Sequence, residues 1–166
     1  LTFWTTADGA TGSTERMRID NQGAITAPTQ PCFSVLPSSQ QANIAVGSNV
    51  TVVFGTEVFD VGSNFASNTF TAPVTGKYQL CASVRLDQVD ADASYYYLRI
   101  ITSNRTYSSI ISPNVLSGDP AYTYMNLPVL ADMDGNDTAY VIVKQSGGSS
   151  QTDLDSECFF TGHLVC

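Results

Sequence analysis

The sequence predicts an all-β protein, because its apolar residues follow the spacing of strands almost throughout. No window of about 11 residues keeps apolar side chains at helical spacing. Short segments rich in Val, Ile, Tyr and Phe instead alternate with clusters of Gly, Pro, Asn, Asp and Ser, which favour turns. With 166 residues, 43% of them hydrophobic, the chain is long enough for one sandwich or barrel domain with its own core.

A connector is expected ahead of this domain, in residues 1–31. It is rich in turn residues, and Pro28 and Pro31 close it before Cys32. Because it has too little apolar surface to build a core, we expect it to be ordered only where partner chains supply the missing face. The domain itself is expected to span residues 32–166. The chain starts at Leu1 rather than at Met, which indicates a piece of a longer protein.

The strands of the domain are predicted from six short segments, in chain order: 49–55, 76–84, 94–101, 122–130, 138–144 and 158–165. The segment SYYYLRII at 94–101 is the most aromatic of them. Its alternating side chains point to opposite faces of a sheet: Tyr96, Leu98 and Ile100 to one, and Tyr95, Tyr97, Arg99 and Ile101 to the other. One set should enter the core. The other is either a covered second face or an exposed Tyr and Arg surface of the kind that contacts partners and sugars.

The charge of the chain disfavours two classes of partner. Fifteen Asp and Glu residues against seven Lys and Arg give a net charge of −8. This charge repels phosphate backbones and anionic lipid headgroups, so we expect no nucleic-acid binding and no binding to a membrane surface. We also expect no membrane insertion, since no apolar run approaches the roughly 18 residues of a spanning segment.

Catalytic motifs are missing from the sequence. A hydrolytic triad needs a histidine as base, and His163, the only histidine, lies in a predicted strand where a structural role is typical. There is no GxSxG motif, no phosphate-binding GxxxxGK[ST] loop and no dinucleotide-binding GxGxxG. We therefore expect no enzyme. Carboxylate pairs in the loops leave glycoside hydrolysis open as an alternative.

Three acidic clusters fall in predicted loops: Asp87, Asp90 and Asp92; Asp132, Asp134 and Asp137; and Asp153, Asp155 and Glu157. Solvated loop tips account for such clusters. The segment DMDGND at 132–137 also alternates oxygen ligands around a glycine, so calcium is possible there, although the bidentate Glu of a helix–loop–helix site is missing. No feature of the sequence requires a cofactor.

The segment FTAPVTGKYQL at 70–80 has a fixed spacing of its turn and aromatic residues: Phe70, Pro73, Gly76 and Tyr78. It resembles the central signature of the C1q-like domain, a member of the C1q and tumour necrosis factor jelly-roll superfamily. FDVGSNF at 59–65 and LADMDGNDTAYVIV at 130–143 resemble the neighbouring segments of that family. The terminal CFFTGHLV resembles its last strand through three residues: Phe160, Gly162 and Leu164.

The resemblance covers residues 32–166 and implies a ten-stranded jelly-roll sandwich that packs as a homotrimer around a threefold axis. The resemblance implies that the motif residues have a structural role, and that the strands around Phe70 and Tyr78 lie in opposite sheets. Some relatives bind calcium through an acidic cluster between two long strands. Here only Asp119 matches, so the metal candidates are Asp119, Asp132, Asp134 and Asp137.

The four cysteines form no CxxC pair, and with one histidine a structural zinc site is not expected. Disulfides in an oxidising setting and buried free thiols both remain open. In the strand order that the resemblance implies, the first strand lies beside the last, which runs antiparallel to the strand of Cys81. That order implies two pairs: Cys32 with Cys166 and Cys81 with Cys158.

The segment TERMRIDNQGAI at 14–25 resembles a repeat of bacteriophage tail fibres and related virion proteins, where it belongs to a trimeric β-structured shaft that precedes a head domain. Together the resemblances imply a non-enzymatic, trimeric head of a virion fibre. It would bind a host cell-surface receptor, a glycan, during attachment, with Tyr95, Tyr97 and Arg99 as contact residues. Other virion proteins would join it through the part of the chain before Leu1.

Two further functions remain open. The domain could be a structural module that decorates a virion or holds three chains in register. It could also be a secreted C1q-like lectin or defence protein. The latter is compatible with three N-glycosylation sequons, at Asn49, Asn104 and Asn136.

Overall fold

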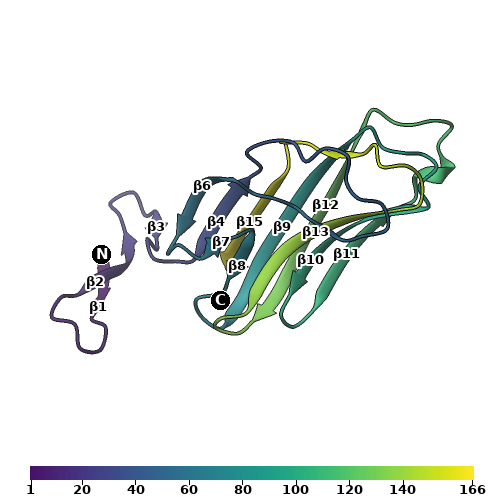
Figure 1. The fold of residues 1–166 in the computed structure, drawn as a ribbon. Coiled ribbons are helices and arrows are strands. Elements are labelled where there is room, and N and C mark those ends of the chain that lie inside the picture. The colour runs from purple at the N-terminus through teal and green to yellow at the C-terminus, as the bar shows by residue number, and fades with distance from the viewer.

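The computed structural model describes residues 1–166 and has two parts, a small N-terminal sheet and a β-sandwich (Figure 1). The all-β prediction is confirmed, since the only helical element is the short 3-10 turn η1, Pro113–Val115. No helix has the length and hydropathy that spanning a membrane would require. Figure 1 shows the small sheet projecting from one end of the sandwich, with η1 at the opposite end.

The N-terminal sheet has three antiparallel strands in the order β1-β2-β3: β1 (Thr2–Thr5), β2 (Thr14–Ile19) and β3 (Ile25–Thr26). Its register gathers apolar side chains on one face, because Phe3 lies opposite Met17 and Ile19 lies opposite Ile25. Leu1 joins them through backbone hydrogen bonds with Ile19. Leu1, Phe3 and Ile25 remain 75%, 44% and 67% exposed, so this sheet has no core of its own.

One sheet of the sandwich, here called the β9 sheet, runs in the order β12-β9-β15-β4-β6, with β14 also paired to β9. All its pairs are antiparallel. Its strands are β4 (Cys32–Leu36), β6 (Thr56–Val61), β9 (Gly76–Asp87), β12 (Tyr122–Met133), β14 (Asp153–Leu154) and β15 (Phe159–Leu164).

The other sheet, here called the β10 sheet, runs in the order β11-β10-β13-β8-β7, with β5 also paired to β13. Its strands are β5 (Val50–Thr51), β7 (Phe65–Ala66), β8 (Thr69–Thr71), β10 (Tyr95–Thr102), β11 (Thr106–Ile111) and β13 (Thr138–Ser146). The two sheets hold six strands each rather than the expected ten in all. The excess arises because two-residue segments of long loops, such as β5 and β14, extend the ladders of β13 and β9.

Aromatic rings fill the core between the sheets. Phe33 packs at 4.6 Å from Phe70 and 5.0 Å from Phe160, measured between ring centroids. Phe70 on β8 and Tyr78 on β9 lie in opposite sheets with their rings 5.4 Å apart. The Tyr78 hydroxyl donates a hydrogen bond of 2.8 Å to the Val74 carbonyl in the turn between them. The FTAPVTGKYQL segment thus joins the two sheets across the core.

The remaining motif residues lie at the ends of strands. Pro73 is exposed in the connection from β8 to β9. Gly76 starts β9 where a Cβ atom would come within 2.6 Å of the Cys166 carbonyl oxygen, so the C-terminus packs directly on its backbone. Leu164, at the end of β15, is partly buried against the core.

Candidate binding surfaces

The outer face of the β9 sheet contains a broad uncharged region. The ladder register aligns outward-facing residues into rows that cross the sheet from β12 toward β6. Three successive rows contain no Asp, Glu, Lys or Arg: Asn126, Ser83 and Phe159; Pro128, Cys81, Thr161, Ser34 and Phe59; and Leu130, Gln79, His163, Cys32 and Val61. This region lies in a chain whose net charge is −8.

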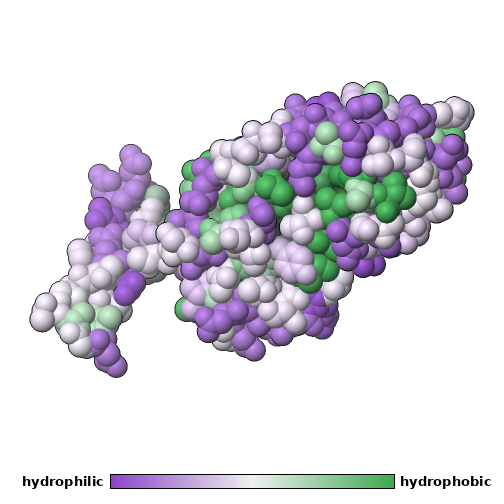
Figure 2. Space-filling view, viewed as in Figure 1, coloured by the Kyte–Doolittle hydropathy of each residue, from purple (hydrophilic) through white to green (hydrophobic).

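Large apolar side chains at the margins of this region are open to solvent. Leu130 on β12 is 56% exposed, Phe59 on β6 is 50% exposed and Tyr124 on β12 is 46% exposed. A sheet face of this composition is typical of a surface that another protein covers. Figure 2, drawn in the orientation of Figure 1, shows a different side of the sandwich, where hydrophobic residues gather toward the middle and hydrophilic ones around the ends.

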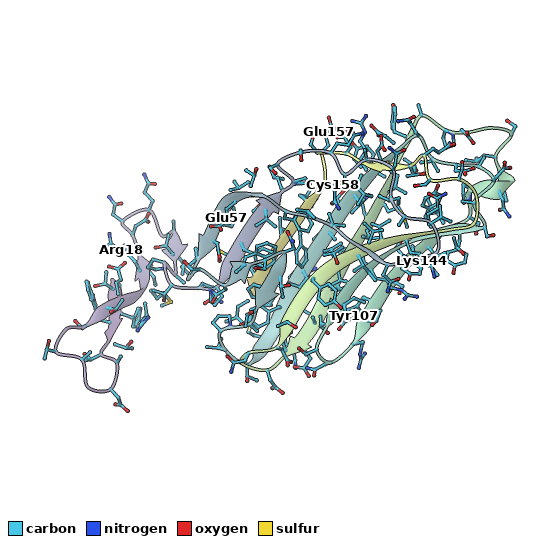
Figure 3. The ribbon with its side chains drawn as sticks, in the orientation of Figure 1. Arg18, Glu57, Tyr107, Lys144, Glu157 and Cys158 are labelled. Atoms are coloured by element: carbon cyan, nitrogen blue, oxygen red, sulfur yellow. The ribbon has the colours of Figure 1, made fainter.

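Ion pairs occupy the two ends of the same face. Lys77 pairs with Asp132 at one end. At the other end, the Arg85 guanidinium contacts Asp87 at 2.7 Å and Glu157 at 2.8 Å. Glu157, labelled in Figure 3, also accepts a 2.5 Å hydrogen bond from the Tyr124 hydroxyl. That hydrogen bond and the Arg85 charge hold the pKa of Glu157 below its usual value.

The outer face of the β10 sheet carries the predicted contact residues. Tyr97 is only 5% exposed there, although it points away from the core. The Arg99 guanidinium carbon lies 3.8 Å from the centroid of the Tyr97 ring, and the Tyr95 ring stacks 6.1 Å away. The Tyr97 hydroxyl donates to the Asn49 side chain on the loop before β5. Tyr97 is therefore enclosed by its neighbours, and its ring cannot serve as the open sugar platform expected from the sequence.

Lys144 completes this group, here called the Tyr97 cluster: Tyr95, Tyr97, Arg99, Lys144 and Asn49. Lys144 on β13 lies directly opposite Tyr97 on β10, with its ammonium nitrogen 6.0 Å from the ring centroid. Figure 3 labels it on the surface of the sandwich. Sequence reasoning missed Lys144 and Asn49, because only strand register and the course of a distant loop bring them to Tyr97.

The metal candidates are not brought together. Asp119 accepts hydrogen bonds from the Ala91 N–H and the Gln151 side chain at the end of the sandwich near η1. Asp132 is paired with Lys77, and Asp137 accepts from Asn104 and from the backbone N–H of Asp134. No His, Cys, Asp and Glu side chains gather in groups of three or more that could hold a metal ion.

A buried carboxylate ties two loops together near η1. Asp90 is 4% exposed and accepts hydrogen bonds from the N–H and hydroxyl of Ser149 and from the N–H of Asp92. The Ser149 N–H contributes most to holding the pKa of Asp90 below its usual value. Gly148 packs so closely that a Cβ atom there would lie 2.3 Å from the carboxylate. These contacts account for Asp90 as a structural residue.

Two open hollows flank the loop that follows η1, and Leu116 lines both. The larger, of about 480 Å³, has four polar lining residues, Asp92, Asn114, Ser117 and Asp119, together with Ala91 and Gly118. The smaller, of about 200 Å³, is largely apolar and includes Val89, Val115 and Tyr122. The larger hollow contains two carboxylates, those of Asp92 and Asp119.

The expected cysteine pairs are not formed, and all four thiols are free. The strand order is the one expected, because β15 lies between β4 and β9. The register differs: Cys32 lies opposite His163 rather than Cys166, and Cys81 lies opposite Thr161 rather than Cys158. Cys158 is instead buried, with its sulfur accepting a 3.3 Å hydrogen bond from the backbone N–H of Arg85. Each expected pair is thus offset by three residues along β15.

No protein-family model and no curated protein matches the chain. Solved structures share its fold. The globular domain of zebrafish complement 1qA protein superimposes with a TM-score of 0.63 and 15% identity, covering 82% of this chain and 98% of that domain. A crystal structure of murine APRIL at pH 8.5 gives a TM-score of 0.58 and 13% identity, covering 82% and 99%. The chain therefore has a jelly-roll-like fold of the C1q and tumour necrosis factor type.

Proposed function

We propose that this chain is the distal part of a virion fibre, whose homotrimeric, non-enzymatic head binds a glycan receptor on a host cell. The observation that carries the proposal is the uncharged region on the outer face of the β9 sheet, at whose margins Leu130 and Phe59 are exposed. Covering apolar area stabilises an assembly by about 25 cal/mol per Å². Three copies of the chain packed through this face would remove it from water within a closed assembly.

The N-terminal sheet supports assembly of the same kind. Leu1, Phe3 and Ile25 form an uncovered apolar face on a sheet too small to be stable alone. The sheet projects from the sandwich (Figure 1), so partner copies could cover this face while their heads pack together. The resemblance of residues 14–25 to a fibre shaft repeat supports a position for this segment between the head and the rest of the virion.

Receptor binding is assigned to the surface that such packing leaves open. The outer face of the β10 sheet lies on the opposite side of the sandwich from the β9 face and carries the Tyr97 cluster. A trimer presents this surface three times, so weak contacts at each site add up to firm attachment. Attachment of this kind requires neither a cofactor nor catalysis.

The test is to incubate the purified 166-residue chain with cells of candidate hosts and with a glycan array. We expect cell binding that competes with phage adsorption. Binding to no permissive host would overturn receptor binding and favour a module that only decorates the virion or holds three chains in register. Steady release of reducing sugar would overturn the non-enzymatic assignment.

A further inference from the structure

Arg99 and Lys144 are two cations without a carboxylate partner on an acidic protein. The other strand cations of the sandwich form ion pairs, Lys77 with Asp132 and Arg85 with Asp87 and Glu157. Neither Arg99 nor Lys144 forms such a pair, although the chain has a net charge of −8. The positive charge of this surface is therefore not neutralised from within the molecule.

Arg99 is held in place by its neighbours, and Lys144 lies beside the same aromatic ring. The Arg99 guanidinium carbon lies over the Tyr97 ring at 3.8 Å from its centroid, and the Arg99 Nε atom donates a 2.9 Å hydrogen bond to Ser108. Lys144 approaches the same ring from the neighbouring strand. Tyr97 is fixed in turn by its hydroxyl contact with Asn49. Ordering these side chains in advance lowers the entropy lost when a ligand binds.

The donors that remain suit an anionic group. The Nη atoms of Arg99 form no hydrogen bond within the protein, and a guanidinium fork matches the two oxygens of a carboxylate or sulfate. Lys144 adds a second positive charge beside it. The hydroxyls of Ser108 and Thr51 lie in the same cross-strand row as Arg99 and are exposed, so they are available to sugar hydroxyls.

We propose that the Tyr97 cluster binds the carboxylate or sulfate group of an acidic saccharide. Arg99 donates to the anionic group, Lys144 contributes the second charge, and the half-buried Tyr95 ring borders the sugar. This inference rests on the proposed function, since it names the class of glycan that the head recognises.

The experiment uses immobilised polygalacturonic acid as the carboxylate probe, dextran sulfate as the sulfate probe and neutral dextran as the blank. We expect retention on at least one acidic probe, none on dextran, and weaker binding as salt is raised, because the attraction is screened. The probe that retains the protein identifies the anionic group. Arg99→Gln and Lys144→Gln should each weaken binding about tenfold or more, since a hydrogen bond to a charged group is lost or a charge is removed.

Arg105→Gln is the matched control. Arg105 is an exposed cation on the turn after β10, it forms no ion pair, and its substitution changes the net charge by the same amount. Unchanged binding by this variant supports the proposal, and an equal loss from all three variants overturns it in favour of unspecific charge attraction. Thermal unfolding of each variant separates a binding defect from misfolding, and Lys144→Gln leaves the closer Arg99–Tyr97 contact in place.

Cell binding separates this inference from the proposed function. If the chain binds host cells but neither acidic probe, the acidic saccharide is overturned and the receptor-binding head stands. If it binds neither cells nor probes, both fail. If it binds the acidic probes but no permissive host, the inference about the surface stands and the attachment role is overturned.

Discussion

Gly162 on β15 lies directly opposite Phe33 on β4, and a Cβ atom at Gly162 would come within 2.6 Å of the Phe33 ring. The same Cβ atom would lie 2.6 Å from the Leu80 side chain. Both neighbours are buried at the centre of the core, so neither can move aside freely. The backbone of the last strand thus packs against the core without room for a side chain.

Gly162→Ala should therefore destabilise the sandwich. Overpacking a filled core costs about 1–3 kcal/mol of unfolding free energy. Urea unfolding followed by tyrosine fluorescence measures the change. Gly118→Ala is the control, because no atom lies within 4 Å of the Cβ position at this loop glycine. Equal midpoints for the two variants would show that the core near Phe33 has room for the methyl group.

Leu130→Arg should dissociate the proposed trimer. Leu130 is 56% exposed in the uncharged region of the β9 sheet, and three arginines brought into that contact would be desolvated without partners. Light scattering should change from three times the chain mass of 17.8 kDa to the mass of one chain. Ile110→Arg is the control, since Ile110 is 59% exposed on the β10 sheet and outside the proposed contact. A single-chain mass for the unmodified protein at micromolar concentration would refute the assembly.

Asp90 should stabilise the folded protein in a pH-dependent way. Its pKa is lowered on folding, chiefly by the Ser149 N–H, so its contribution is complete above the ordinary carboxyl pKa of 3.8 and is lost as the pH falls below that value. Asp90→Asn should lower stability at neutral pH by about 1–3 kcal/mol, because the amide nitrogen replaces one accepting oxygen and must face the N–H of either Ser149 or Asp92.

Asp92→Asn is the matched control for this carboxylate, since Asp92 is exposed two residues away and carries the same charge. Unfolding midpoints measured from about pH 3 to pH 7 should show that Asp90→Asn has a weaker dependence on acid, whereas Asp92→Asn behaves like the unmodified protein. Parallel pH profiles for both variants would mean that the Asp90 contacts do not contribute to folding.

The four thiols should react in the order of their exposure. Cys166 is exposed, Cys32 and Cys81 are partly buried on the β9 sheet, and Cys158 is fully buried. Burial also raises the pKa of Cys158 to about 11, so little of its reactive thiolate forms near neutral pH. Timed alkylation read by mass spectrometry should label Cys166 first and Cys158 only after denaturant is added. Labelling of Cys158 before denaturant is added would contradict its burial beside the Arg85 backbone.

The proposed trimer adds a second expectation for the thiols. Cys32 and Cys81 both lie within the uncharged rows of the β9 sheet. They should be protected in the assembled protein and label faster in Leu130→Arg, whereas Cys166 should react at the same rate in both. Unchanged rates at Cys32 and Cys81 would place the contact between copies on another surface.

The sequence by itself determined the all-β class and much of the local pattern. Alternation along 94–101 indicated which side chains share a face, and Tyr96, Leu98 and Ile100 are fully buried in the structure. The jelly-roll type followed from the resemblance of FTAPVTGKYQL to the C1q-like signature, whose residues Phe70, Gly76 and Tyr78 are close together in the chain. These features depend on residues within one strand or one turn, where the two-residue period of the backbone fixes which way each side chain points.

Only the tertiary structure decided the register of the ladders and the surroundings of Tyr97. A three-residue offset along β15 separates Cys32 from Cys166 and Cys81 from Cys158, and no single strand encodes it. Likewise Asn49, 48 residues away in the chain, reaches the Tyr97 hydroxyl because β5 happens to pair with β13. Register and the path of a long loop are set by many contacts between residues distant in sequence. Alternation within one strand predicts its two faces, but it does not predict which residues of the neighbouring strands lie opposite them.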